Sequence, residues 1–159
     1  MSKGTYVFQL GDVAEATGSS YPETLKSVTE ERYVRRLSGP AGIANFGVNV
    51  VRLLPGGQSS WRHAHSKQDE FVYVMDGALV MTTDAGEQTV AAGTCIGFPA
   101  GSGDAHCFAN RSDRDATFLV IGDRSGGDVI TYPDVDLHGE LDAAGQLRFT
   151  RKDGTAYEN

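Results

Sequence analysis

The sequence is poor in cysteine and has no long hydrophobic run. Two cysteines in 159 residues are too few for a disulfide framework in a chain that can bury its own core. No stretch approaches the roughly 20 apolar residues of a membrane span. The first residues also lack the apolar run of about 7–15 residues found in secretory signal peptides. We therefore expect a soluble, cytoplasmic protein without a membrane partner.

Basic residues are in the minority, since 14 Lys and Arg stand against 21 Asp and Glu, for a net charge of -7. An acidic protein repels nucleic-acid phosphates, and no local run of basic residues offsets this, so we expect no nucleic-acid partner. Proline is also scarce, with 5 residues, whereas glycine is abundant, with 20. This excess of glycine predicts many tight turns between short strands.

Short apolar runs alternate with glycine-containing turns from about residue 46 to 122. Strands spaced about ten residues apart are typical of an antiparallel sandwich or barrel, and not of alternating strands and helices. The sequence therefore predicts an all-β fold in a single domain over residues 1–159. We expect the barrel core at 46–122, a tail at 123–159 and an N-terminal extension at 1–45. A short helix or an irregular segment is expected after Pro22.

The four histidines are the chemically most informative residues. His63 and His65 lie two apart in a strand-like run, so both imidazoles point to one face. Glu70 opens the next apolar run, where a hairpin can bring it opposite them, and His106 begins a later strand. Three imidazoles and one carboxylate suit Mn, Fe, Co, Ni, Zn or Cu. His138, in the polar tail, is interpreted as a surface or hydrogen-bonded residue.

A glycine-framed motif surrounds the first three of these ligand candidates. Five residues separate Gly57 from His63, a His-x-His pair follows, four residues lead to Glu70, and six more lead to Gly77. A second motif runs from Gly93 to Asn110 and contains Pro99, a glycine two residues further on, and His106.

Together these motifs resemble the two motifs of the cupin superfamily. The second motif departs in one place, because its turn between Pro99 and His106 is two residues longer than the commonest form. The resemblance implies a small double-stranded β-helix, or jelly-roll-like barrel, whose mouth holds a divalent transition metal such as Zn, Fe, Mn, Ni or Co. The ligands it implies are the same four residues, His63, His65, Glu70 and His106. It also implies a homodimer built on outer barrel strands, in keeping with Phe71 and Tyr73 on the face opposite Glu70.

Three histidines and one carboxylate can leave a coordination position open, which lets a metal polarise a carbonyl, activate water or bind dioxygen. Cupins include dioxygenases, sugar phosphate isomerases, decarboxylases and non-catalytic binding proteins, and fold alone does not choose among them. The chain resembles small cupins that carry either the name sugar phosphate isomerase or simply that of cupin-domain protein. We predict a metal-dependent enzyme acting on a small polar metabolite, with isomerase-like or dioxygenase-like chemistry. The alternative is a non-catalytic, metal-dependent sensor or binding protein for a small ligand.

The sequence identifies no catalytic acid or base beyond the metal ligands. Three aromatic residues are candidates for an apolar pocket wall or for plain core packing, namely Trp61, Phe98 and Phe108. Three basic residues are candidate contacts for an anionic group of the substrate, namely Arg52, Arg62 and Arg124.

Overall fold

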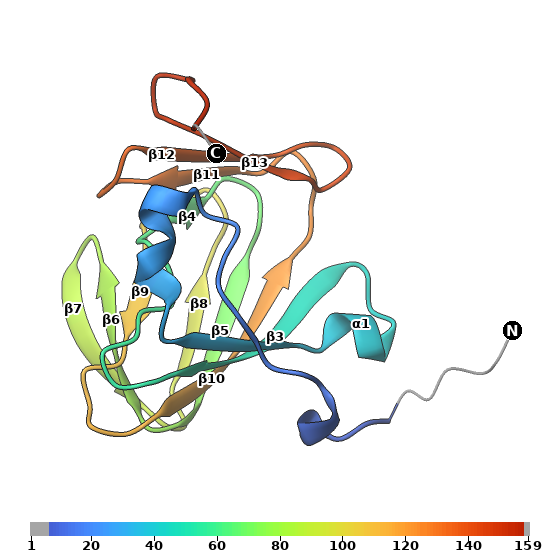
Figure 1. The fold of residues 1–159 in the computed structure, drawn as a ribbon, viewed down its shortest axis with the longest axis vertical. Helices are drawn as coiled ribbons and strands as arrows, with labels where there is room; N and C mark the ends of the chain where they lie inside the picture. Colours follow the sequence, from blue (N-terminus) through green and yellow to red (C-terminus); the bar gives the residue numbers. More distant parts are fainter. Residues whose placement is uncertain (1–6, 158–159) are drawn as a thin grey trace, which may run out of the picture.

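The computed structural model describes residues 7–157, which form three antiparallel β-sheets and a few short helices (Figure 1). The largest sheet has the strand order β1 (Ala16–Thr17), β2 (Arg32–Arg36), β3 (Phe46–Leu53), β10 (Ala116–Asp123), β5 (Glu70–Asp76) and β8 (Cys95–Phe98). A second sheet has the order β7 (Gly86–Ala91), β6 (Ala78–Thr83) and β9 (Cys107–Ala109). The third has the order β13 (Leu147–Thr150), β12 (Leu137–Leu141), β11 (Val129–Tyr132) and β4 (Ala64–His65). The prediction of an all-β fold is confirmed, as an open arrangement of sheets rather than a closed barrel.

The main hydrophobic core lies between the six-stranded and the three-stranded sheets. Leu53, Val72 and Phe118 come from the larger sheet, and Leu79 and Phe108 come from the smaller one. Each of these side chains is at most 2% exposed. Burial of such large apolar side chains, at roughly 1.5–3 kcal/mol each, holds the two sheets face to face.

Strand β5 shows how the sequence pattern produces this packing. Its valines, Val72 and Val74, are fully buried, whereas the alternate residues Phe71, Tyr73 and Met75 are 39%, 37% and 42% exposed. Successive side chains on a strand point to opposite faces, so β5 supplies the core on one face and an apolar surface on the other.

The turn after β5 requires glycine. Gly77 has a φ of 78°, a left-handed conformation that L-residues with a side chain rarely adopt. A Cβ atom at Gly77 would also lie 2.9 Å from the Cα and Cβ atoms of Ala116 at the start of β10. Gly77 therefore permits the close approach of this turn to β10.

The four-stranded sheet covers one end of the molecule and carries a second core. Tyr21, Ile130, Tyr132 and Leu137 are its buried members. The 3-10 helix η2 (Glu23–Thr29) contributes Leu25 and Val28 to the same cluster. The prediction of a short helix after Pro22 is confirmed in this 3-10 form.

Two segments differ from expectation. The tail provides three strands, β11 to β13, which pair with each other as two local hairpins, and β11 also pairs over a long sequence separation with β4. The strand-like run before Glu70 forms only the two-residue strand β4, and His63 adds a single antiparallel bridge to His106. Within residues 7–157, no helix combines the length and apolar character that crossing a membrane requires.

Candidate metal centre

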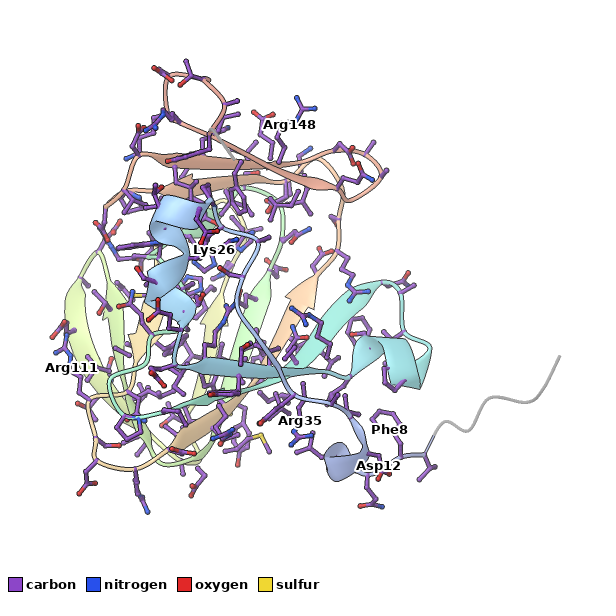
Figure 2. The ribbon with its side chains drawn as sticks, viewed as in Figure 1. Phe8, Asp12, Lys26, Arg35, Arg111 and Arg148 are labelled. Atoms are coloured by element: carbon purple, nitrogen blue, oxygen red, sulfur yellow. The ribbon has the colours of Figure 1, made fainter. Side chains whose placement is uncertain are left out.

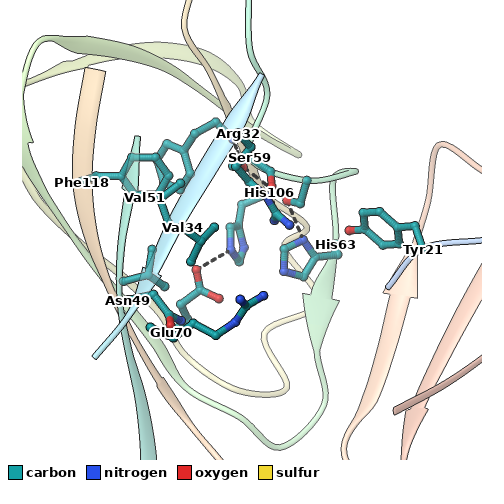
Figure 3. Close-up of a pocket in the computed structure, with 14 residues that line it drawn as sticks. Tyr21, Arg32, Val34, Asn49, Val51, Ser59, His63, Glu70, His106 and Phe118 are labelled. Atoms are coloured by element: carbon teal, nitrogen blue, oxygen red, sulfur yellow. Dashed lines mark hydrogen bonds and ion pairs between the residues drawn. The ribbon is translucent and has the colours of Figure 1, made fainter. Parts of the chain in front are cut away.

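Three of the four predicted ligands converge at one point. His63 precedes β4, Glu70 begins β5 and His106 precedes β9, and each offers a ligand atom within 4.8 Å of the other two (Figure 3). Two backbone hydrogen bonds join His63 and His106, with N–O distances of 3.0 and 2.8 Å. This bridge places the two imidazole rings 4.9 Å apart. Three segments that are distant in sequence thus form one group of nitrogen and oxygen ligands.

His106 is the most deeply buried of the group, at 2% exposed. Both of its ring nitrogens are buried without a hydrogen-bond partner among the described residues. Its Nε2 lies 3.6 Å from Oε1 of Glu70, too far for a hydrogen bond. Phe98 stacks on the ring, with centroids 3.4 Å apart and planes inclined by 7°, and so fixes its orientation. A buried polar group without a partner costs about 1–3 kcal/mol, a cost that coordination of a metal ion would relieve.

The tautomer of His63 follows from its surroundings. Its Nδ1 lies 3.0 Å from the backbone oxygen of Trp61, which can only accept a hydrogen bond. Nδ1 therefore carries the proton, and the lone pair is on Nε2. Burial, together with the neighbouring imidazoles, lowers the pKa of His63 to about 4 against the opposing effect of Glu70. The ring is neutral at pH 7, as a metal ligand must be.

His65 lies beside this group, with its ring centroid 5.0 Å from that of His63, but outside the set of three atoms described above. Its Nδ1 is 2.6 Å from Oδ2 of Asp128, a carboxylate with no exposed surface. Asp128 also accepts hydrogen bonds from Ser66 Oγ at 3.1 Å and from the Lys67 backbone at 2.7 Å. A carboxylate that orients the Nδ1–H of a histidine leaves Nε2 free for a metal.

The carboxylates around the centre are ionised. Burial alone would raise the pKa of Glu70, but the facing His106 and the other two histidines lower it. Burial would likewise raise the pKa of Asp128, and the hydrogen bonds from His65 and Lys67 lower it. Sequence reasoning missed Asp128, because it lies in the tail without a local motif.

The fourth histidine is distant from this chemistry. His138 lies in β12, where its Nε2 is 3.0 Å from Oε1 of Glu140. It does not belong to the group of convergent ligands. This agrees with its interpretation as a hydrogen-bonded surface residue.

A cavity of about 280 Å³ opens onto the centre. His63, Glu70 and His106 line it, and its remaining walls come from β2, β3, β9, β10, the segment before β4 and the segment before η2. Its apolar lining consists of Val34, Val51, Phe108, Phe118 and Val120, and its other polar lining consists of Tyr21, Arg32, Arg36, Asn49, Ser59 and Ser60. The volume is close to the lower end of the range of about 300–1,000 Å³ for small-molecule pockets.

The three aromatic candidates for a pocket wall or for core packing divide between these roles. Phe108 lines the cavity, and Phe98 stacks on His106. Trp61 instead packs against the second core, and its indole Nε1–H donates to the backbone oxygen of Leu25 at 3.0 Å.

The three candidate arginines do not line the cavity. Arg52 pairs with Glu15 and Asp115, and Arg62 pairs with Asp84 and Asp134. Arg124 does not line the cavity either. Two other basic residues do so, Arg32 and Arg36 of β2. Strand periodicity in Arg32–Arg36 could have placed these two on one face, but the sequence gives no indication of what that face meets.

Comparison with known proteins identifies similar chains. Residues 49–122 match the family described as "Cupin domain". The crystal structure of a sugar phosphate isomerase from a cupin superfamily, from Silicibacter pomeroyi, is 44% identical, with 96% of each chain covered and a TM-score of 0.90.

Two further solved structures are more distant. A candidate sugar phosphate isomerase from Acidithiobacillus ferrooxidans is 26% identical, covering 80% of this chain and 81% of that one, with a TM-score of 0.71. The polyketide cyclase RemF from Streptomyces resistomycificus is 23% identical over 74% of this chain and 78% of its own, with a TM-score of 0.62, and shares the fold. No curated protein matches the chain.

Proposed function

The chain belongs to the cupin superfamily, and from this premise we propose that it is a metal-dependent enzyme acting on a small polar metabolite. Similarity over 96% of the chain to a structure named as a sugar phosphate isomerase favours isomerase-like over dioxygenase-like chemistry. The observation that carries the proposal is His106, whose two buried ring nitrogens have no hydrogen-bond partner within residues 7–157 while Glu70 and His63 face it.

The proposed ligands of a divalent transition metal are His63, His65, Glu70 and His106. The Nδ1 atoms of His63 and His65 each bond to a fixed acceptor, so each ring offers Nε2. Glu70 adds one negative charge, which lowers the net charge of the centre. These donors suit Zn, Fe, Mn, Ni or Co, and their chemistry does not select one of these ions.

When bound, such an ion supplies Lewis-acid polarisation of a substrate oxygen, or redox chemistry if it is redox-active. The protein's own residues bind and orient the substrate. Val34, Val51 and Phe118 supply apolar walls beside the centre (Figure 3), where they would exclude water from a bound substrate. Asn49 and Ser59 place polar groups on the same walls, where they can bond to substrate hydroxyl groups.

One observation favours a second candidate, a metal-dependent binding or sensor protein without turnover. Besides the proposed ligands, the titratable side chains that line the cavity are Tyr21 and two arginines. Burial raises the pKa of Tyr21, so its hydroxyl stays protonated at neutral pH and cannot accept a proton as a general base. An isomerase would need its ligand carboxylate, Glu70, or a substrate hydroxyl to move the proton.

A metabolite panel separates the two candidates. Metal-loaded protein is incubated with sugar phosphates, diketones and small acids, with and without air, and products are followed by mass spectrometry. We expect conversion of at least one sugar phosphate by the wild type and by His138→Ala, and none by His106→Ala. If the wild type binds metal but converts nothing, the binding protein is the better account.

A further inference from the structure

Strand β2 turns two arginines toward the candidate centre. Arg32, Val34 and Arg36 alternate along the strand, and all three line the cavity. The intervening Arg35, labelled in Figure 2, does not line the cavity. It pairs instead with Glu15 of the N-terminal segment. Strand parity therefore separates two inward-facing guanidinium groups from an outward-facing one.

Arg32 has an unusual set of partners for a largely buried arginine. Its Nη1 donates to the backbone oxygen of Ser59 at 2.7 Å, and its Nη2 donates to that of Gly18 at 3.0 Å. Its Nε is buried and has no partner among the described residues. Figure 3 shows Arg32 above the cavity, beside Ser59 and His106. Buried charges in proteins are normally paired with an opposite charge, whereas in the described part of the chain Arg32 is bonded only to neutral carbonyl groups.

Neither inward-facing arginine forms an ion pair within residues 7–157. This sets them apart from Arg52 and Arg62, each of which binds two carboxylates. Arg36 is exposed and pairs in register with Asn49, which also lines the cavity.

A second hollow, of about 480 Å³, shares Tyr21, Arg32 and Arg36 with the first. It is also lined by Ser19, whose hydroxyl is buried without a partner among the described residues. The two arginines thus lie where the two hollows meet, and the Ser19 hydroxyl lies in the second hollow.

The charge of the cavity is opposite to that of the protein. Two guanidinium groups and one carboxylate line it, an excess of one positive charge that a divalent ion would increase, whereas the whole chain carries -7. A low-dielectric, positively charged cavity in an acidic protein concentrates anions.

We propose that Arg32 and Arg36 form an anion subsite beside the His63–Glu70–His106 group and bind a phosphate or carboxylate group of the ligand. This inference rests on the proposed function, because it assigns the charged end of that function's substrate. Arg32 meets the anion from the buried side, and Arg36 meets it from the exposed side. The uncharged part of the ligand then extends toward Glu70 and the histidines. Phosphate and carboxylate share anionic oxygens in forked geometry, which suits arginine donors.

The test uses metal-free protein, so that an anion cannot be held by an ion at the centre. Nitrogen-15-labelled protein is titrated with glycerol 3-phosphate, glycerate and glycerol, which present a phosphate, a carboxylate and no charge on similar scaffolds. We expect both anions, but not glycerol, to shift the Nε–H signal of Arg32. The tighter of the two anions identifies the natural charged group.

Variants then assign the site. Arg36→Gln and Arg32→Lys should each weaken anion binding by about tenfold or more, the effect of losing one charge-assisted hydrogen bond. Arg114→Gln removes the same charge from an arginine that does not line the cavity, and its binding should be unchanged. Arg36 is exposed, so Arg36→Gln keeps the test valid even if Arg32→Lys lowers the melting temperature.

Equal binding of glycerol and the anions, or unchanged anion binding in Arg36→Gln and a folded Arg32→Lys, would overturn the subsite. These outcomes are independent of metal binding and turnover. A protein that binds anions through both arginines but neither binds metal nor converts substrate would retain the subsite and contradict the proposed function.

Discussion

Asp128→Asn tests how the fold prepares His65 for metal binding. In the wild type, Oδ1 of Asp128 accepts hydrogen bonds from Ser66 Oγ and from the Lys67 backbone N–H, while Oδ2 accepts from His65 Nδ1 at 2.6 Å. An asparagine has one carbonyl oxygen and one NH₂ group for these positions. Because the Lys67 N–H can only donate, the amide oxygen should remain at the Oδ1 position, and the NH₂ group should face His65.

The consequence is a change of tautomer. Nδ1 of His65 must then accept from the amide, which moves the ring proton to Nε2, where a metal would need the lone pair. Loss of such an orienting carboxylate weakens metal binding by about 10–100-fold. Loss of the charge-assisted hydrogen bond should also lower the free energy of unfolding by about 1.5–3 kcal/mol.

Zn²⁺ affinity can be measured by competition with a chelator, and the tautomer by nitrogen-15 shifts of the His65 ring in metal-free protein. Asp142→Asn is the matched control, because Asp142 also accepts two backbone hydrogen bonds, from Ala144 and Gln146, but in an exposed turn. If Asp128→Asn bound Zn²⁺ as tightly as the wild type, with Nδ1 of His65 still protonated, the reasoning would be refuted.

Three further predictions concern stability and assembly. In metal-free protein, the pKa of His63 is lowered to about 4 in the folded state. At a pH below the ordinary histidine pKa of about 6.5, His63 therefore binds more protons in the unfolded chain than in the folded one. The free energy of unfolding should therefore fall by about 3 kcal/mol from His63 alone as the pH decreases from about 6.5 to 4, and a flat profile in denaturant titrations would contradict this. Gly77→Ala should lower the free energy of unfolding by about 3 kcal/mol, through left-handed backbone strain and the clash with Ala116. Gly56 has a similar φ but open space around it, so Gly56→Ala should lower the free energy of unfolding clearly less in the same titrations. We also predict a homodimer formed through the exposed apolar face of β5; Met75→Glu should yield monomers in light scattering, and a monomeric wild type at micromolar concentration would exclude it.

Much of the fold was predictable because local patterns encode it. The alternation of β5 and the glycine at position 77 are visible in the sequence, and the structure contains both. Glu70 and His63 are close in sequence, and a short connection brings them together. The spacing around His106 identified the third member of the group, because its motif resembles that of a known family.

The rest depended on long-range pairing that no local pattern encodes. Asp128 reaches His65 only because β11 pairs with β4 across more than sixty residues of sequence. Arg32 and Arg36 face the cavity because β2 pairs with β3. Arg62 was a candidate for anion binding but instead pairs with Asp134, which the tail sheet carries to it.

The central claim is that His63, His65, Glu70 and His106 hold a metal, and metal content tests it most directly. Purified wild type, His106→Ala and His138→Ala would be analysed by mass spectrometry of the elements after identical loading and desalting. His138 is the matched control, since it is a histidine bonded to a carboxylate outside the convergent group. The account predicts stoichiometric transition metal in wild type and His138→Ala and loss of most of it in His106→Ala. Full metal content in a folded His106→Ala, or loss in His138→Ala alone, would contradict it.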